Sequence, residues 1–209
     1  MFVQLLLGLF IVGTLVGILT AIPYRSGLLD VAAGLPVPSD EIIALEDRYN
    51  AAFLLVTVSF VATAIAFVTW FWRAYSNLAY FERPRKRKPG WALGSWFIPI
   101  AGLFIPYGIG AEIWAQSKPD TGRSEQRRDI NMEPVISWWA LFLIMSFVNV
   151  IESFMLPEDY TAGDLAAYVG VDMVAAVVAI AAAIAAIRFV HVATDRQEEL
   201  LAMGRPEAS

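Results

Sequence analysis

Three polar residues lie at the edges of long apolar stretches, where an unpaired charge would be costly. Arg73 and Asn77 are four residues apart, so on a helix they share one face. Glu112 lies near the end of a second apolar stretch. A charged group near a bilayer usually finds a partner. We therefore predict an Arg73–Glu112 ion pair with Asn77 nearby, acting either as a structural clamp or as part of a solute site.

The apolar stretch from residue 91 to 114 is interrupted by Pro99 and Pro106, and Tyr107 follows the second proline. Proline removes a backbone donor and breaks a helix. Such a break at membrane depth is tolerated only where the backbone is buried in protein or faces a wet cavity. The segment is predicted either to be purely architectural, as a kinked interfacial helix, or to aim two half-helices at a solute or ion.

Asp172 is the only acid well inside the last apolar run, 165–187. An intramembrane carboxylate relays protons or coordinates ions, or else it is structural and reaches interfacial water. Glu152, near the end of the preceding run, is a predicted neighbour.

Five basic residues are concentrated within six positions after the second apolar run. Each cation near an anionic leaflet contributes about 1 kcal/mol of attraction. This run is predicted to hold lipid headgroups, or to act only as a topological signal; its members are Arg83, Arg85, Lys86, Arg87 and Lys88.

Several kinds of chemistry have no residues to support them. The chain contains no cysteine and a single histidine, His191, which excludes thiolate chemistry and leaves little for a histidine-based metal site. No nucleophile–base set or nucleotide-binding loop is visible. We expect no catalytic residue, no metal and no cofactor. Nucleic acid is not an expected partner, because the net charge is −5.

The elements that would position these groups are membrane spans. Hydrophobic residues make up 58% of the 209 residues and charged residues 17%, against about 25% charged in soluble domains. Four apolar runs of about 20 residues are long enough to cross a bilayer. They predict one all-α membrane domain over residues 1–209, with spans at about 2–22, 51–72, 135–155 and 165–187, a broken segment at 91–114, and a charged tail at 191–209.

Basic residues collect in cytoplasmic loops, so their distribution predicts the topology. If 91–114 crossed the membrane, six basic residues would face the cytoplasm and nine would not. If the segment instead enters and leaves on one side, thirteen face the cytoplasm and two, Arg25 and Arg48, do not. We therefore predict four spans with both termini cytoplasmic. The seven tryptophans, all between residues 70 and 139, would then form a belt at the cytoplasmic interface.

Small residues predict close helix packing in two places. Gly13 and Gly17 form a Gly-x-x-x-Gly pattern in the first span, which lets a neighbouring helix approach. The last span is rich in alanine on every face, which we interpret as contact with several helices, including those of another protein.

"WFWRAYSNLAYF", "PGWALGSWFIPIAGLFIPYGIGAEIW" and "SWWALFLI" occur in that order. Together they resemble the domain of unknown function number 4328, a family of bacterial multi-span membrane proteins, over about residues 60–155. The matching positions are Trp70, Arg73, Asn77, Pro89, Gly90, Trp91, Trp96, Pro99, Pro106, Tyr107, Glu112, Trp114, Trp138 and Trp139. One family asparagine is replaced here by Gly102. The resemblance implies an architecture and no activity.

The expected function is that of a non-catalytic accessory or scaffold subunit in the bacterial inner membrane. Its expected partners are membrane lipids and the integral subunits of a respiratory, photosynthetic or transport complex. The alternative is a small channel, carrier or sensor that uses the broken segment, Glu112 and Asp172.

Overall fold

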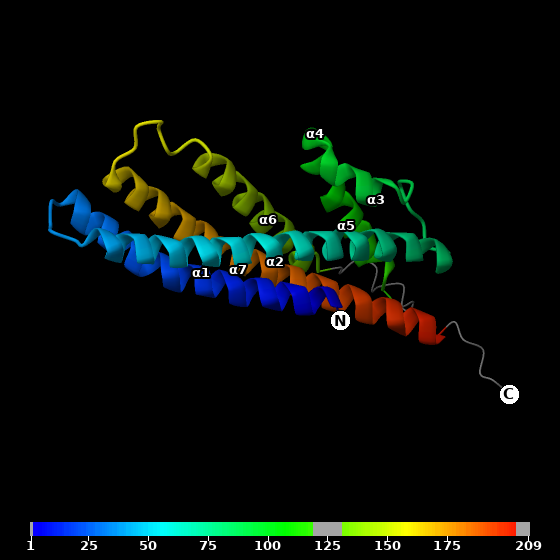
Figure 1. Ribbon diagram of the computed structural model, residues 1–209. Helices are drawn as coiled ribbons and strands as arrows, with labels where there is room; N and C mark the ends of the chain where they lie inside the picture. The colour runs from blue at the N-terminus through cyan, green and yellow to red at the C-terminus, as the bar shows by residue number, and fades with distance from the viewer. Residues whose placement is uncertain (1, 119–130, 204–209) are drawn as a thin grey trace. The chain divides into compact units, whose positions relative to one another are not determined.

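The computed structural model describes residues 2–118 and 131–203, and every regular element in these ranges is helical (Figure 1). The predicted all-α class is confirmed. The elements are α1 (Phe2–Ala32), α2 (Ser39–Tyr80), α3 (Trp91–Gly94), the 3₁₀ helix η1 (Ser95–Phe97), α4 (Pro99–Gly102), α5 (Ile105–Gln116), α6 (Glu133–Glu152) and α7 (Ala162–Met203).

Four of these helices, α1, α2, α6 and α7, are long and apolar enough to cross a membrane. α1, α2 and α7 contain the predicted spans at 2–22, 51–72 and 165–187, whereas α6 ends at Glu152, three residues before the predicted end of the span at 135–155. The chain thus has the make-up of a multi-pass membrane protein. Three of the four helices extend well beyond the apolar runs: α1 continues to Ala32, and in α2 and α7 good helix-forming polar residues continue the pattern. α2 already begins at Ser39, and α7 continues through the start of the charged tail to Met203.

The broken segment consists of two helical parts, 91–97 and 99–116, which bend by 116° at Ile98. Such a pair is either one broken span or a re-entrant loop. Pro99 and Pro106 lie in the first turns of α4 and α5 rather than inside a longer helix. A proline is well tolerated there, because the first N–H groups of a helix have no intrahelical acceptor.

The chain forms two compact units whose boundaries fall inside the long helices. Unit 1 comprises Met1–Leu5, Ala64–Ala140 and Ala185–Ser209; unit 2 comprises Leu6–Thr63 and Leu141–Ile184. The single domain over residues 1–209 stays a prediction.

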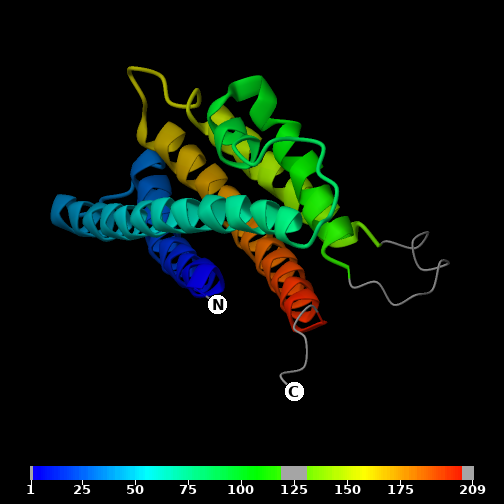
Figure 2. The same ribbon diagram turned by 90° about the vertical axis from the view of Figure 1, so that its right-hand side faces the viewer.

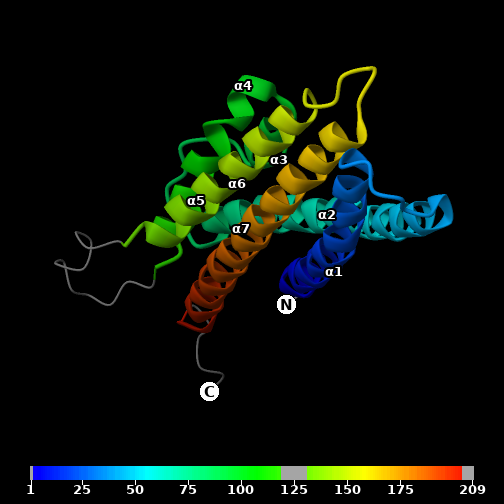
Figure 3. The same cartoon turned by 90° about the vertical axis from the view of Figure 1, so that its left-hand side faces the viewer.

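In unit 2, parts of α1, α2, α6 and α7 pack through small and aromatic side chains. One buried cluster contains Ala21, Tyr24, Leu28, Ala166 and Val169. The α6 and α7 segments of unit 2 are joined by the loop drawn in yellow in Figure 3. Gly13 and Gly17 face α2: a Cβ on either would lie 3.6 Å from Ser59 or Val56, respectively. The glycine pair therefore supports a close contact between α1 and α2.

Unit 1 contains the short helices α3, α4 and α5, drawn in green in Figure 2, and an aromatic core. Trp138 is at the centre of this core and its ring lies 5.0–6.4 Å from the rings of five neighbours, Phe67, Phe71, Trp96, Trp139 and Phe189. Gly110 lets α5 lie close to this ring, because a Cβ there would lie 3.0 Å from Trp138 Cζ3, closer than most side-chain contacts.

Three of the seven tryptophans in the belt expected from the sequence are buried inside unit 1. Trp114, Trp138 and Trp139 are buried, whereas Trp72 and Trp91 are about 40% exposed. The Trp138 and Trp139 rings pack on one another, and the Trp114 and Trp138 rings pack on Phe189. Packing in a shared core therefore explains part of the clustering in sequence, and the belt stays a prediction.

Two helices end in the same hydrogen-bonding pattern with different residues at the left-handed position. In α1, Leu35 N–H donates to Asp30 O and Gly34 has φ +75°. In α2, Arg83 N–H donates to Leu78 O and Glu82 has φ +54°. Both are Schellman motifs, in which glycine is preferred because a Cβ is strained there. α2 therefore ends with a strained Glu82.

Replacing Glu82 by glycine should raise the free energy of unfolding by about 1 kcal/mol, since it removes the Cβ strain. The measurement is the midpoint of thermal loss of the monodisperse gel-filtration peak in detergent. Glu82→Ala is the matched control, because it removes the same carboxylate and keeps the Cβ. An equal gain from both substitutions would contradict the strain and indicate an effect of charge.

Candidate functional site

Glu112 in unit 1 is the best-connected polar group in the broken segment. It lies on α5 and is 91% buried. Its Oε2 accepts hydrogen bonds from the Tyr75 hydroxyl at 2.8 Å and from the backbone N–H of Lys86 at 2.9 Å. Its Oε1 faces Arg87 Nη1 at 3.6 Å and makes no hydrogen bond. Glu112 thus joins α5 to α2 and to the basic loop.

The predicted partner of Glu112 was wrong, although the prediction that it needs one was right. Among the described residues, Arg73 forms no ion pair with Glu112 and is exposed. The reason is helical phase: Tyr75, which faces inward and is fully buried, lies about 200° around α2 from Arg73. The cation that faces Glu112 is Arg87, from the loop after α2.

Replacing Arg73 by alanine should change the free energy of unfolding by less than about 0.5 kcal/mol, as is usual for exposed surface positions. Arg87→Ala should lower it by about 1–2 kcal/mol, because it leaves the buried Glu112 carboxylate without its cation. Heating purified variants in detergent and measuring the monodisperse fraction compares the two arginines directly. A larger loss from Arg73→Ala than from Arg87→Ala would contradict this geometry.

Asn77 belongs to a second polar cluster in unit 1, centred on Gln197 of α7. Gln197 is buried, accepts from Asn77 Nδ2 at 3.1 Å, and donates to Ala74 O at 2.9 Å and Ser117 Oγ at 3.0 Å. This residue ties α2, α7 and the end of α5 together. Sequence reasoning did not single it out, because it lies in the charged tail.

Arg196, one residue earlier, binds α5 as well. Its guanidinium lies 4.0 Å from the centre of the Trp114 ring, and its Nη1 donates to Trp114 O at 3.1 Å. The Trp114 indole N–H donates in turn to Asn131 O at 2.8 Å. The C-terminal part of α7 is therefore an integral part of unit 1.

The two prolines differ in surroundings. Pro106 is almost fully buried, whereas Pro99 is exposed and Tyr107 is half-buried. Protein groups bind Oε2 of Glu112, and its Oε1 faces Arg87. The arrangement suits a structural clamp that holds α5 against α2.

The basic run alternates between two directions. Arg83, Arg85 and Arg87 are half-buried: Arg83 Nη2 donates to Lys118 O at 3.5 Å and the Arg85 guanidinium lies 5.9 Å from the centre of the Tyr75 ring. Lys86 and Lys88 are exposed. Thus the arginines contact protein, and the two lysines are the members of the run that are free to meet headgroups. Four arginines that the topology prediction counts on the cytoplasmic side lie outside the described residues: Arg123, Arg127, Arg128 and Arg205.

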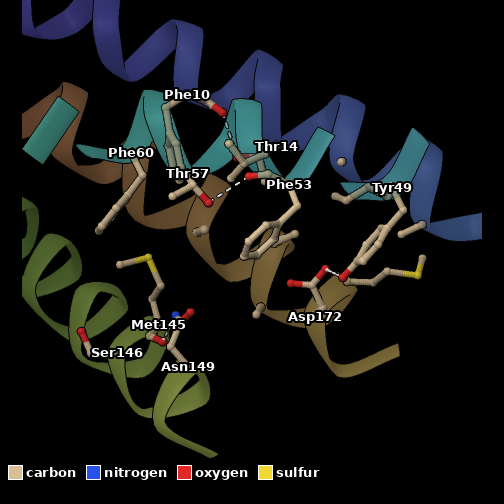
Figure 4. Close-up of a pocket in the computed structure, with 18 of the residues that line it drawn as sticks. Phe10, Thr14, Tyr49, Phe53, Thr57, Phe60, Met145, Ser146, Asn149 and Asp172 are labelled. Atoms are coloured by element: carbon tan, nitrogen blue, oxygen red, sulfur yellow. Dashed lines mark hydrogen bonds between the residues drawn. The ribbon is translucent and has the colours of Figure 1, made fainter. Parts of the chain in front are cut away.

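Unit 2 contains a cavity of about 490 Å³ between its α1, α2, α6 and α7 segments (Figure 4). Most of its wall is apolar and aromatic, including Phe10, Phe53 and Phe60. Asp172, the predicted intramembrane carboxylate, lies in this wall. Its Oδ2 accepts a hydrogen bond from the Tyr49 hydroxyl at 2.8 Å. The structure therefore places Asp172 and Glu112 in different sites, one in each unit.

Glu152 is the predicted neighbour of Asp172, and the two carboxylates are close enough to interact electrostatically. Glu152 is 92% buried, and its Oε1 has no hydrogen-bond partner among the described residues. Tyr49 was missed from the sequence, because 123 residues separate it from Asp172.

No group of three or more metal-ligating side chains occurs in residues 2–118 and 131–203. A family model described as Domain of unknown function (DUF4328) matches residues 36–195. Neither the curated proteins nor the solved structures provide a significant match.

Proposed function

Because the chain belongs to the DUF4328 family, whose description carries no activity, we propose a function from the geometry of its sites. In this proposal the protein is a non-catalytic scaffold subunit that packs against a larger complex in the bacterial inner membrane. The host is a respiratory, photosynthetic or transport assembly, and anionic lipid bound at Lys86 and Lys88 supports the contact.

The observation that carries this proposal is the set of partners around Glu112. Tyr75, the Lys86 backbone and Arg87 engage its carboxylate from within unit 1. Other positions of the family pattern, such as Trp114 and Trp138, are also buried in internal contacts. A pattern whose residues hold helices together favours an architectural role over a solute site at the same segment.

The proposed topology has four spans, with both termini and the broken segment on the cytoplasmic side. Its support is the distribution of basic residues, thirteen against two, together with the sharp bend of 116° at Ile98. A continuous fifth span would need no such bend.

Single cysteines test this topology cleanly, because the chain has none of its own. Ser124→Cys should resist an impermeant maleimide added to intact cells, and Asp159→Cys should react. Leu35→Cys and Lys88→Cys are controls, since both arrangements place the first outside and the second inside. Reaction at residue 124 with protection at residue 159 would establish five spans instead.

Purification in mild detergent tests the scaffold role. The tagged chain, expressed at native level in its host, should elute in a complex with integral membrane partners at fixed stoichiometry. A four-span membrane protein with the same tag is the control for nonspecific capture. A lone chain that moves a solute across liposome membranes would overturn the proposal.

The second candidate is a small carrier or sensor. The observation that favours it is the unit 2 cavity with Asp172 in its wall, rather than the broken segment where we first expected such a site.

A further inference from the structure

The unit 2 cavity has the size and lining of a small-molecule site. Its volume of about 490 Å³ lies within the 300–1,000 Å³ that is usual for ligand pockets. Phenylalanine side chains from α1 and α2 line one side, and Met145 of α6 faces the space from another direction (Figure 4). An occupant therefore needs an apolar body.

The hydroxyl donors in the wall are already engaged. The threonine and serine hydroxyls each donate to the carbonyl four residues earlier in their own helix: Thr14 to Phe10, Thr57 to Phe53 and Ser146 to Phe142. The Asn149 amide donates to Met145 O, and the Tyr49 hydroxyl donates to Asp172. What the wall still offers to a ligand is mainly acceptor oxygens. A complementary ligand must therefore supply the donors.

The charge of the cavity wall also favours a ligand that supplies hydrogen-bond donors. Asp172 is the only charged residue among those that line the cavity, and Glu152 adds a second carboxylate close by. The basic residues of unit 2 are Arg25 and Arg48, and neither lines the cavity. Arg25 is instead engaged with the carbonyl of Ala166 at 3.1 Å. A carboxylate in apolar surroundings without a protein cation favours a cationic ligand.

We propose that this cavity binds lipophilic ammonium ions, namely primary amines with an aromatic or alkyl body. The ammonium group donates to the Asp172 carboxylate, and the body lies among the phenylalanine rings, which also attract the cation through their faces. Tyr49 orients the carboxylate through its hydrogen bond. This inference goes beyond the scaffold function and holds with or without partner subunits.

The test is equilibrium dialysis with the full chain in nanodiscs of zwitterionic lipid, after subtraction of partitioning into empty nanodiscs. The probes are 4-phenylbutylamine and its neutral analogue 4-phenylbutan-1-ol. The wild-type chain should bind one amine saturably and at least tenfold more tightly than the alcohol. Asp172→Asn, which keeps an acceptor for Tyr49, should weaken amine binding at least tenfold and leave the alcohol unchanged. Glu158→Gln, which removes an exposed carboxylate of the same unit, should alter neither.

Equal affinity of the wild-type chain for amine and alcohol would overturn the proposal and identify an apolar cavity suited to lipid chains. Unchanged amine binding in Asp172→Asn, or no saturable binding at all, would overturn it too. If Asp172→Asn does not fold, Ala176→Phe takes its place, because it fills the cavity from α7. That variant should lose at least tenfold in amine affinity, and full retention would show that the amine binds elsewhere.

Discussion

Replacing Glu112 by leucine is expected to lower the free energy of unfolding by about 3 kcal/mol, because it leaves two hydrogen-bond donors around a buried carboxylate without their acceptor. The substitution leaves the Tyr75 hydroxyl and the Lys86 N–H without their acceptor, and Arg87 without its anion. The midpoint for thermal loss of monodisperse protein in detergent should fall by roughly 5–10 °C.

The conservative variants show whether this loss comes from the buried contacts. Glu112→Gln keeps the shape and an acceptor, so about 1–2 kcal/mol is expected. Glu133→Gln is the matched control, because Glu133 pairs with Arg188 at 2.8 Å while both side chains are more than half exposed. Exposed pairs of this kind contribute about 0–1 kcal/mol. If Glu112→Gln and Glu133→Gln lower the free energy of unfolding equally, Glu112 is not a clamp.

Replacing Trp138 by alanine is expected to be the most damaging single change in unit 1, with a loss of about 4 kcal/mol. The indole contacts five aromatic rings and is 97% buried. In a membrane the loss is one of van der Waals contacts, since lipid is as apolar as the protein interior. Chemical unfolding in mixed micelles measures this loss of stability as a shift of the denaturant concentration at the unfolding midpoint.

Trp72→Ala is the control, because it deletes the same group from a side chain that is 41% exposed, and less than about 1 kcal/mol is expected. Trp138→Phe keeps a ring and should lose less than half of the alanine effect. Equal losses at positions 72 and 138 would contradict the aromatic core.

The sequence was a good guide to the long helices. A run of about 20 apolar residues has few stable conformations in a bilayer other than a helix, so residue type alone located α1, α2, α6 and α7. Pro99 and Pro106 likewise revealed the broken segment, because proline limits the backbone whatever surrounds it. These features depend on local chemistry.

The side-chain partners of the polar residues were harder to predict, because they depend on which side of a helix faces inward. Arg73 and Tyr75 are two residues apart, and only the buried face of α2 decides that Tyr75 meets Glu112. Arg87 reaches the same carboxylate from a loop whose conformation depends on Glu82 at the end of α2. Likewise, nothing local pairs Tyr49 with Asp172.

The alanine-rich helix shows how one pattern supports two interpretations. We expected its small side chains to meet helices of another protein. In unit 2, Ala166, Ala175 and Ala179 are buried within the chain itself, so internal packing already explains part of the pattern. The alanine content alone therefore does not support a partner protein, and the purification experiment has to test that proposal.

All seven tryptophans lie between Trp70 and Trp139 and belong to unit 1, and unit 2 has tyrosine and phenylalanine as its aromatic residues. The chain consequently has a built-in optical reporter that is confined to one unit. Its indole fluorescence will follow the melting of unit 1 and will not register an event restricted to unit 2. A change in tryptophan emission on adding an amine would then be a direct signal that the two units communicate.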